Sequence, residues 1–331
     1  MDIQHGGVIR PNSVLLATDG SKDAALAARV ATDLSQKTGA QLHVAHAWRH
    51  HIQGLGYPTV AWTDYSYIYE REARRLLAAQ VDSIEATGDL VAEPHLLQGP
   101  PIDAILDLCD ELRPGLVVMG SRGLGPVGRI FVGSVSEGVV HHARCPVLVV
   151  RGGDEAWPPE RIVAGDDGSE SAGLAAGMAA GIGSLFGAEN VLVRAHRNPP
   201  QPIGGWSASD RRRLDEARAR ETEELNRRAQ ALGDAVGSRS ETRVLDADAT
   251  LALLLVAEEG DERKTLLAVG SRGLSGMGRA RLGSVSTNII RAARGPVLIV
   301  SRPAEEITTR ASRETIAAAP RSRPATPSSP R

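Results

Sequence analysis

The sequence reads Gly-Ser-Arg-Gly at residues 120–123 and, after nine further residues, Gly-Ser at 133–134. The same pattern, G-x2-G-x9-G-S, returns at residues 270–273 and 283–284. Each copy follows an apolar run (116–119 and 266–269) and precedes a short helical stretch and a second apolar run (146–150 and 296–300). Both copies therefore predict a strand, a glycine loop, a helix and another strand. Recurrence in the same local context argues against coincidence.

Length and composition narrow the class of protein. With 331 residues, the chain has room for about two domains, each with its own core. It is 42% hydrophobic and 24% charged with net charge −2, which gives no case for nucleic acid or an anionic membrane as a partner. It has no signal-peptide core and no apolar run of membrane-spanning length, so we expect a cytoplasmic protein. Cys109 and Cys145 lack a CxxC spacing and are expected to be reduced thiols.

The first half of the chain alternates strands with helices. Five strands are predicted at 14–17, 41–48, 94–98, 116–119 and 146–150, with helices at 24–34, 70–86, 102–112 and 135–143 between them. This alternation is typical of a doubly wound α/β fold, in which helices cover both faces of a parallel sheet. Residues 49–69 predict a loop whose aromatic side chains either cover the end of the sheet or stack on a ligand.

The second half repeats the first. Residues 162–169 repeat the pattern of 15–21 after an offset of 148, and helices are predicted at 211–232 and 251–258. We therefore expect two tandem domains, 13–151 and 160–302, joined by a linker at 151–160. Residues 303–331, rich in Pro, Ser, Thr, Ala and Arg, predict a disordered tail.

The glycines lie where a parallel sheet binds ligands, at the carboxyl ends of its strands. Asp19, Ala47 and Gly120 end the first, second and fourth strands and should converge there. Glycine lets the backbone approach a phosphate closely, and Ser134 opens a helix whose free N–H groups favour an anion. The pattern therefore predicts a phosphate cradle. For Asp19 alone a turn role is an equal alternative, because Asp-Gly is a turn pair and Ser21 a good helix N-cap.

Two better-known phosphate motifs are excluded. A G-x-G-x-x-G match at 123–128 follows the fourth strand instead of the first and is lost at 273–278, so it is not a dinucleotide-binding fingerprint. G-x4-G-K-[ST] is absent from the sequence, which excludes a P-loop.

The sequence resembles a tandem universal stress protein of the ATP-binding subgroup. The family hallmark, G-x2-G-x9-G-[ST] with a following helix and a Pro-Val-Leu-Val strand, matches residues 120–150 and 270–300, and the likeness covers 13–151 and 160–302. It implies five parallel strands per domain in the order 3-2-1-4-5, and one ATP per domain with Mg²⁺ or Mn²⁺. By resemblance, the nucleoside contacts are Asp19, Ala47, Asp167 and Arg197, and the phosphate contacts are Gly120, Gly123, Gly133, Ser134, Val135, Ser136, Gly270, Gly273, Gly283, Ser284, Val285 and Ser286.

The second repeat departs from this family in two places. The G-x-P at 99–101 becomes Ala-Asp-Ala at 247–249, and Arg197 stands where a small apolar residue is usual, so occupancy of the second site is the weaker expectation. Hydrolysis needs a positioned base and charge stabilisation. The spacing singles out no base among the nearby candidates, which are Asp19, Arg122, Arg129, Asp167, Arg272 and Arg279. The histidine pairs at 50–51 and 141–142 favour surface roles over metal binding or catalysis.

Three functions remain open. The first is an ATP-binding regulatory protein with slow or no hydrolysis and an unidentified protein partner. The second is an ATPase or a nucleotidyl- or phosphotransferase using the same site, and the third is an interaction module with degenerate sites. The apolar strands at 147–150 and 297–300 are candidate edge strands, which favour pairing with another strand. In single-domain members of the family this strand mediates dimers, so the resemblance implies that the two domains pair with each other, and a homodimer of the whole chain stays open.

Overall fold

The computed structural model describes residues 9–49, 63–123, 133–196, 205–271 and 282–301. The first domain alternates strands and helices as predicted. Its strands are β1 (Ser13–Ala17), β2 (Gln41–Trp48), β3 (Val91–Gln98), β4 (Leu116–Gly120) and β5 (Val147–Val150). Its helices are α1 (Lys22–Thr38), α2 (Thr63–Glu85), α3 (Pro101–Leu112) and α4 (Ser134–His142).

The second domain repeats this order after a short 3-10 helix at Asp154–Ala156. Its strands are β6 (Arg161–Gly165), β7 (Glu189–Ala195), β8 (Ser240–Leu245), β9 (Thr265–Gly270) and β10 (Val297–Val300). Its helices are α5 (Glu170–Ser184), α6 (Ala208–Val236), α7 (Ala249–Glu258) and α8 (Ser284–Ala292). The predicted tail at 303–331 lies outside the described residues.

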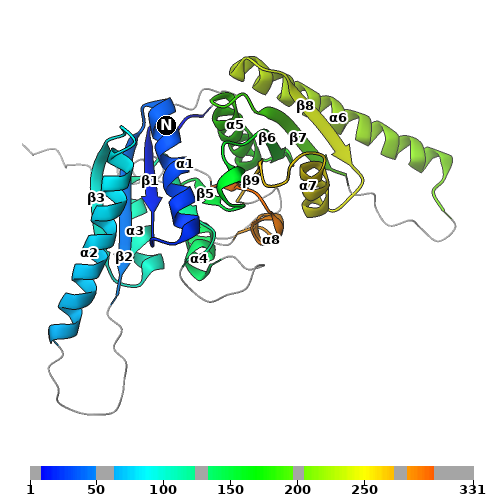
Figure 1. The fold of residues 1–331 in the computed structure, drawn as a ribbon. Helices are drawn as coiled ribbons and strands as arrows, with labels where there is room; N and C mark the ends of the chain where they lie inside the picture. The colour runs from blue at the N-terminus through cyan, green and yellow to red at the C-terminus, as the bar shows by residue number, and fades with distance from the viewer. Residues whose placement is uncertain (1–8, 50–62, 124–132, 197–204, 272–281, 302–331) are drawn as a thin grey trace, which may run out of the picture.

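All ten strands form one sheet in the order β3-β2-β1-β4-β5-β10-β9-β6-β7-β8 (Figure 1). Within each domain the strands are parallel in the order 3-2-1-4-5, which confirms the predicted fold. β5 and β10 pair antiparallel and join the two domains, as predicted from their apolar sequences. Leu148 pairs with Leu298, its counterpart in the other repeat, and the pairing is symmetric about these two residues. The domains are therefore related by a local two-fold axis through the seam.

The seam carries reciprocal polar contacts near its ends. Arg151 Nη1 donates to the Ala293 carbonyl at 2.8 Å, and Ser301 Oγ donates to the Ala143 carbonyl at 3.2 Å. Burial, and to a lesser extent the nearby Arg122 guanidinium, lower the pKa of Arg151 to about 10. Each contact joins the end of a seam strand in one domain to the end of a helix in the other.

Two layers of helices cover the sheet and bury its apolar side chains. Alternate strand residues pack against α1, α2, α5 and α6 on one face, and against α3, α4, α7 and α8 on the other. Both faces are covered because every crossover between parallel strands carries a helix. Among the helices of the described ranges, none is both long and apolar enough to cross a membrane.

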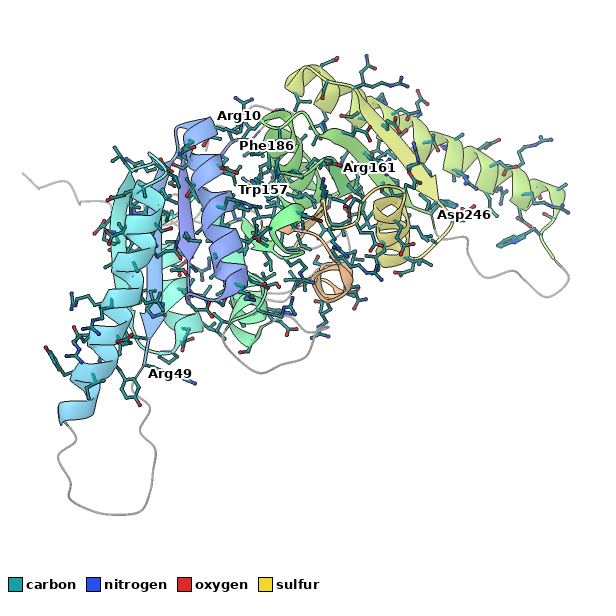
Figure 2. All side chains as sticks on the ribbon, in the orientation of Figure 1. Arg10, Arg49, Trp157, Arg161, Phe186 and Asp246 are labelled. Carbon is teal, nitrogen blue, oxygen red and sulfur yellow. The ribbon has the colours of Figure 1, made fainter. Side chains whose placement is uncertain are left out.

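The linker is more ordered than its composition predicts. Trp157 is buried, its Nε1 donates to Asp33 Oδ2 on α1 at 2.9 Å, and its ring meets Phe186 edge-on at 5.0 Å between centroids. Figure 2 shows both aromatic residues at the junction of the two halves. Arg29 on α1 also donates to the backbone carbonyls of Asp154 and Trp157. The linker therefore packs against both domains.

The predicted loop at 49–69 needs a correction. Helix α2 already begins at Thr63, so the end of that segment is helical, while residues 50–62 lie outside the described part of the chain. Tyr67 is 64% exposed and Tyr69 46% exposed, so neither covers the end of the sheet. Their spacing reflects the exposed first turns of a helix.

Candidate functional site

Asp19 and Gly123 face each other at the carboxyl end of the first domain's sheet. Asp19 Oδ1 accepts a hydrogen bond from the Ser21 backbone N–H at 3.0 Å, which is the predicted turn role. A Cβ atom on Gly123 would collide with Asp19 Oδ2. The absence of a side chain at 123 therefore lets the glycine loop approach the carboxylate, which a turn role alone does not require.

The loop after β4 is held against the N-terminus of α1. Ser21 Oγ caps α1 by accepting from the Ala24 N–H at 3.2 Å and donates to the Arg122 carbonyl at 3.0 Å. Asp23 Oδ2 accepts from Ser121 Oγ at 2.7 Å and lies 3.4 Å from Arg122 Nε. These contacts fix the direction in which the loop leaves the sheet.

Gly120 and Gly133 complete the frame of the first cradle. A Cβ on Gly120 would lie 2.7 Å from the Asp23 carbonyl carbon, so only glycine fits where β4 ends against α1. The Gly133 N–H donates to the Ser121 carbonyl at 2.7 Å, which closes the loop at its other end. Because Gly133 is the N-cap of α4 and offers no capping side chain, the first N–H groups of that helix have no side-chain acceptor from the cap.

The three residues that open α4 differ in their surroundings. Ser134 is exposed in the first turn and Val135 is half-buried. Ser136 is buried, and its hydroxyl donates to the Gly120 carbonyl at 2.7 Å, so it ties the helix to β4. The exposed hydroxyl is therefore at Ser134, while the Ser136 hydroxyl serves the fold.

The second domain builds the same frame. Asp167 Oδ1 accepts from the Ser169 N–H at 3.0 Å, and a Cβ on Gly270 would lie 2.6 Å from Ser171 Oγ. Gly283 donates its N–H to the Ser271 carbonyl at 2.8 Å and caps α8 without a side chain. At the N-terminus of α8, Ser284 is exposed and Val285 is half-buried. Ser286 is buried, and its hydroxyl donates to the Gly270 carbonyl at 2.7 Å. Gly273 lies outside the described residues.

The residue that precedes the site aspartate differs in charge between the two domains: it is Thr18 before Asp19 and Asp166 before Asp167. In the second domain, Asp166 has a side chain only 1% exposed, 2.7 Å from Arg194 Nη2 and 3.1 Å from Arg228 Nη1. Asp166 Oδ1 also accepts from the Gly168 N–H at 2.7 Å. Residue-by-residue inspection of the repeats did not predict this ion cluster, because its members lie far apart in the sequence.

The first domain has a neutral group at the same positions, 148 residues earlier. Thr18 Oγ1 donates to Gln80 Oε1 at 3.3 Å, and His46 Nδ1 lies 2.8 Å from the Thr18 carbonyl. Thr18, His46 and Gln80 are the counterparts of Asp166, Arg194 and Arg228 in the other repeat. Aligning the repeats was therefore the sequence signal that would have revealed the difference.

Strand register corrects one predicted residue. Ala17 on β1 pairs with Ala45, and Gly165 on β6 pairs with Val193, so the counterpart of Ala47 is Ala195. Arg197 corresponds to Arg49 instead, and it lies outside the described residues. The predicted charge beside the adenine position therefore results from a two-residue misalignment of the repeats.

The loop after the third strand of each domain also differs. In the first domain Pro100 precedes α3 and makes no side-chain capping bond. In the second, Asp248 is the N-cap of α7, and its carboxylate accepts from the Thr250 N–H at 2.9 Å. Asp248 therefore brings a negative charge to the end of the sheet at which the glycine loop of the second domain leaves.

Other candidate residues have structural partners. His142 Nδ1 lies 2.8 Å from the Gly138 carbonyl, and His141 Nε2 lies 3.9 Å from Glu137. Cys109 and Cys145 are free thiols brought together by α3 and the turn before β5, and the hydrogen bond to Cys145 raises the pKa of Cys109. Of the charge-stabilising candidates, Arg122 is described, whereas Arg129, Arg272, Arg279 and the histidines at 50–51 lie outside the described residues.

An open cleft lies away from both glycine loops. It runs between the end of α6 and the start of β8, with Gly233, Ser238 and Arg243 among its lining residues. These residues lie toward the amino ends of the parallel strands, so the cleft does not belong to the cradle.

Comparison with known proteins agrees with this architecture. The model of the universal stress protein family matches residues 11–151 and 159–301. A universal stress protein from Thermus aquaticus is 40% identical over 139 residues, covering 42% of this chain and 98% of that protein. A universal stress protein from Mycobacterium tuberculosis is 28% identical over 305 residues, covering 88% of this chain and 97% of that protein.

A solved structure shares the whole architecture. The crystal structure of a universal stress protein from Archaeoglobus fulgidus covers 89% of this chain and 100% of its own, with 22% sequence identity and a TM-score of 0.62. This likeness concerns the fold alone. Because the family model matches both halves, the chain belongs to the universal stress protein family and carries its domain twice.

Proposed function

We propose that this protein binds ATP, with Mg²⁺ or Mn²⁺, at the glycine loop of each domain and acts in the cytoplasm as a stress-response regulator with little or no hydrolysis. The observation that carries the proposal is the convergence of Asp19, Gly123 and the N-terminus of α4 at one end of the first sheet. Gly123 lets the backbone lie directly against a carboxylate, and Gly133 leaves the helix N-terminus without a side-chain cap. Those are the features that a nucleotide needs, since phosphates bind helix N-termini and glycine-lined backbone.

Each residue then has a defined task. Asp19, whose Oδ1 accepts from the Ser21 N–H, is proposed to contact the ribose hydroxyls. The N–H groups at the start of α4 and the exposed Ser134 hydroxyl donate to phosphate oxygens. A divalent cation bound with the nucleotide would neutralise part of the triphosphate charge.

The first domain is proposed to bind ATP more tightly than the second. Asp248 places a carboxylate at the sheet end of the second domain, where Pro100 stands in the first. By the family resemblance this loop bears on the fit of adenine and ribose, so we expect its change to weaken binding in the second domain. The buried Asp166 cluster also replaces the neutral Thr18 group next to the aspartate.

Substitution at the helix N-terminus tests the proposal without weakening the fold. Ser134→Asp adds a negative charge at an exposed first-turn position, where it favours the helix dipole but repels phosphate. Ser134→Thr keeps the hydroxyl and is the matched control, and Ser284→Asp applies the same change to the second domain. The measurement is mass spectrometry of nucleotides released from the purified full chain, with ATP titration of the nucleotide-free protein.

We expect wild type and Ser134→Thr to carry ATP, Ser134→Asp to lose the tighter site, and the double Asp variant to lose both. Wild-type protein that carries no ATP and shows no measurable affinity for it would leave the interaction module as the surviving function. Turnover well above the rate in buffer, abolished by Asp19→Asn, would instead establish the enzyme.

A further inference from the structure

Three side chains of metal-binding type gather on the outer strands of the first domain. His43 lies on β2, and Glu93 and His95 lie on β3. β2 and β3 pair with His43 opposite Glu93 and Ala45 opposite His95, which places all three side chains on the sheet face covered by α3. Their ligand atoms lie within 4.8 Å of one another, and they are the sole such group of His, Cys, Asp and Glu among the residues the structure describes.

The distances suit a tetrahedral ion. His43 Nδ1 lies 3.2 Å from His95 Nε2. Two nitrogens bound to tetrahedral Zn²⁺ at about 2.05 Å stand roughly 3.3 Å apart. Glu93 Oε2 is 4.0 Å from His95 Nε2, and its side chain is 62% exposed, so a rotation brings it into range. The two imidazole nitrogens, which share a hydrogen bond, therefore have the spacing of two metal ligands, and a bound ion would replace that hydrogen bond.

The donor set indicates the class of ion. Two imidazole nitrogens and one carboxylate oxygen suit Zn²⁺ and its borderline neighbours, whereas Mg²⁺ and Ca²⁺ prefer oxygen ligands alone. Burial lowers the pKa of His43, as does the neighbouring His95, while Glu93 acts in the opposite direction. Three protein ligands leave the fourth position to water.

The second domain supplies an internal comparison. Val191 pairs with Glu241, and Val193 with Arg243, so Val191, Glu241 and Arg243 occupy the positions of His43, Glu93 and His95. There Arg243 Nη1 forms an ion pair with Glu241 Oε2 at 3.0 Å. The same fold is thus built without histidines at these positions, so strand pairing does not require them.

We propose that His43, Glu93 and His95 bind one divalent transition-metal ion of the Zn²⁺ class. The site lies about 13 Å along β2 from Ala47, at roughly 3.3 Å per residue, and is separate from the glycine-loop end of the sheet. The ion joins the edge strand β3 to β2, and so links the outer edge of the first domain to its core.

Equilibrium dialysis against ZnCl₂ tests the site, using untagged full-length protein freed of nucleotide and metal. We expect one Zn²⁺ per chain in the wild type, none in His43→Ala or His95→Ala, and weaker binding in Glu93→Gln. His142→Ala, on α4, is the matched histidine control and should bind as wild type. Co²⁺ should give the visible absorption of a four-coordinate site, and Mg²⁺ should not compete.

A gain-of-function variant covers the case in which a histidine deletion unfolds the protein. The double variant Val191→His/Arg243→His creates, together with Glu241, the same set of two histidines and one glutamate in the second domain. We expect it to bind a second Zn²⁺. Wild-type stoichiometry in folded His43→Ala and His95→Ala overturns the proposal, as does a wild type that binds no Zn²⁺. A folded gain-of-function variant without a second ion contradicts the geometric argument.

Discussion

Asp166→Thr should destabilise the second domain strongly, because it removes the anion that holds two arginines. The Arg194 side chain is 9% exposed and lies 2.7 Å from Asp166, so the substitution leaves a buried guanidinium without its main partner. Removing one member of a buried ion pair costs about 3–5 kcal/mol. At about 2–4 °C per kcal/mol for a domain near 150 residues, the unfolding midpoint of the second domain should fall by roughly 6–20 °C.

A triple variant separates the charge effect from general damage. Asp166→Thr/Arg194→His/Arg228→Gln writes the neutral group of the first domain into the second, and Thr18 shows that a threonine there still accepts from the N–H two residues on. Replacing a whole buried ionic group is often neutral or stabilising, so most of the loss should be recovered.

Guanidinium unfolding followed by circular dichroism measures both variants, and the slopes show whether the two domains still unfold together. Thr18→Ala in the first domain is the matched control for loss of a neutral bond, with an expected cost of about 1 kcal/mol. A single-variant cost below about 1 kcal/mol, or a triple variant no more stable than the single, would refute the reasoning.

Three further predictions concern packing. Gly120→Ala forces a Cβ to 2.7 Å from the Asp23 carbonyl carbon and should cost about 1–3 kcal/mol in chemical denaturation. Gly173→Ala, at an exposed α5 position with no atom within 4 Å of the new Cβ, should stabilise by roughly 0.8–1 kcal/mol in the same assay; destabilisation there would contradict the open space. Trp157→Ala should cost about 3–5 kcal/mol in the free energy of unfolding, measured by thermal unfolding. Trp157→Phe loses only the hydrogen bond to Asp33 and part of the ring, so it should cost clearly less. Equal costs would show that ring packing is not the main contribution.

Local sequence predicted most of the fold because its determinants are local. Apolar runs of strand length between helical stretches predicted the parallel sheet, and the repeat predicted two domains. The apolar character of β5 and β10 marked them as edges that favour another strand, and the family resemblance predicted that they pair with each other. The start of α2 was wrong because its first turns carry exposed aromatic residues, which resemble a loop when the sequence is read alone.

The glycine pattern by itself determined where the candidate nucleotide site lies, because a glycine loop after a parallel strand must leave at the carboxyl end of the sheet. The tertiary structure decided which side chains meet there. It brought Asp166, Arg194 and Arg228 together in one domain and Thr18, His46 and Gln80 in the other, and its strand register identified Ala195 as the counterpart of Ala47. It also packed Trp157 between the domains and gathered His43 with His95. These contacts join residues that are distant in the chain, and only strand register and helix packing determine which distant residues become neighbours.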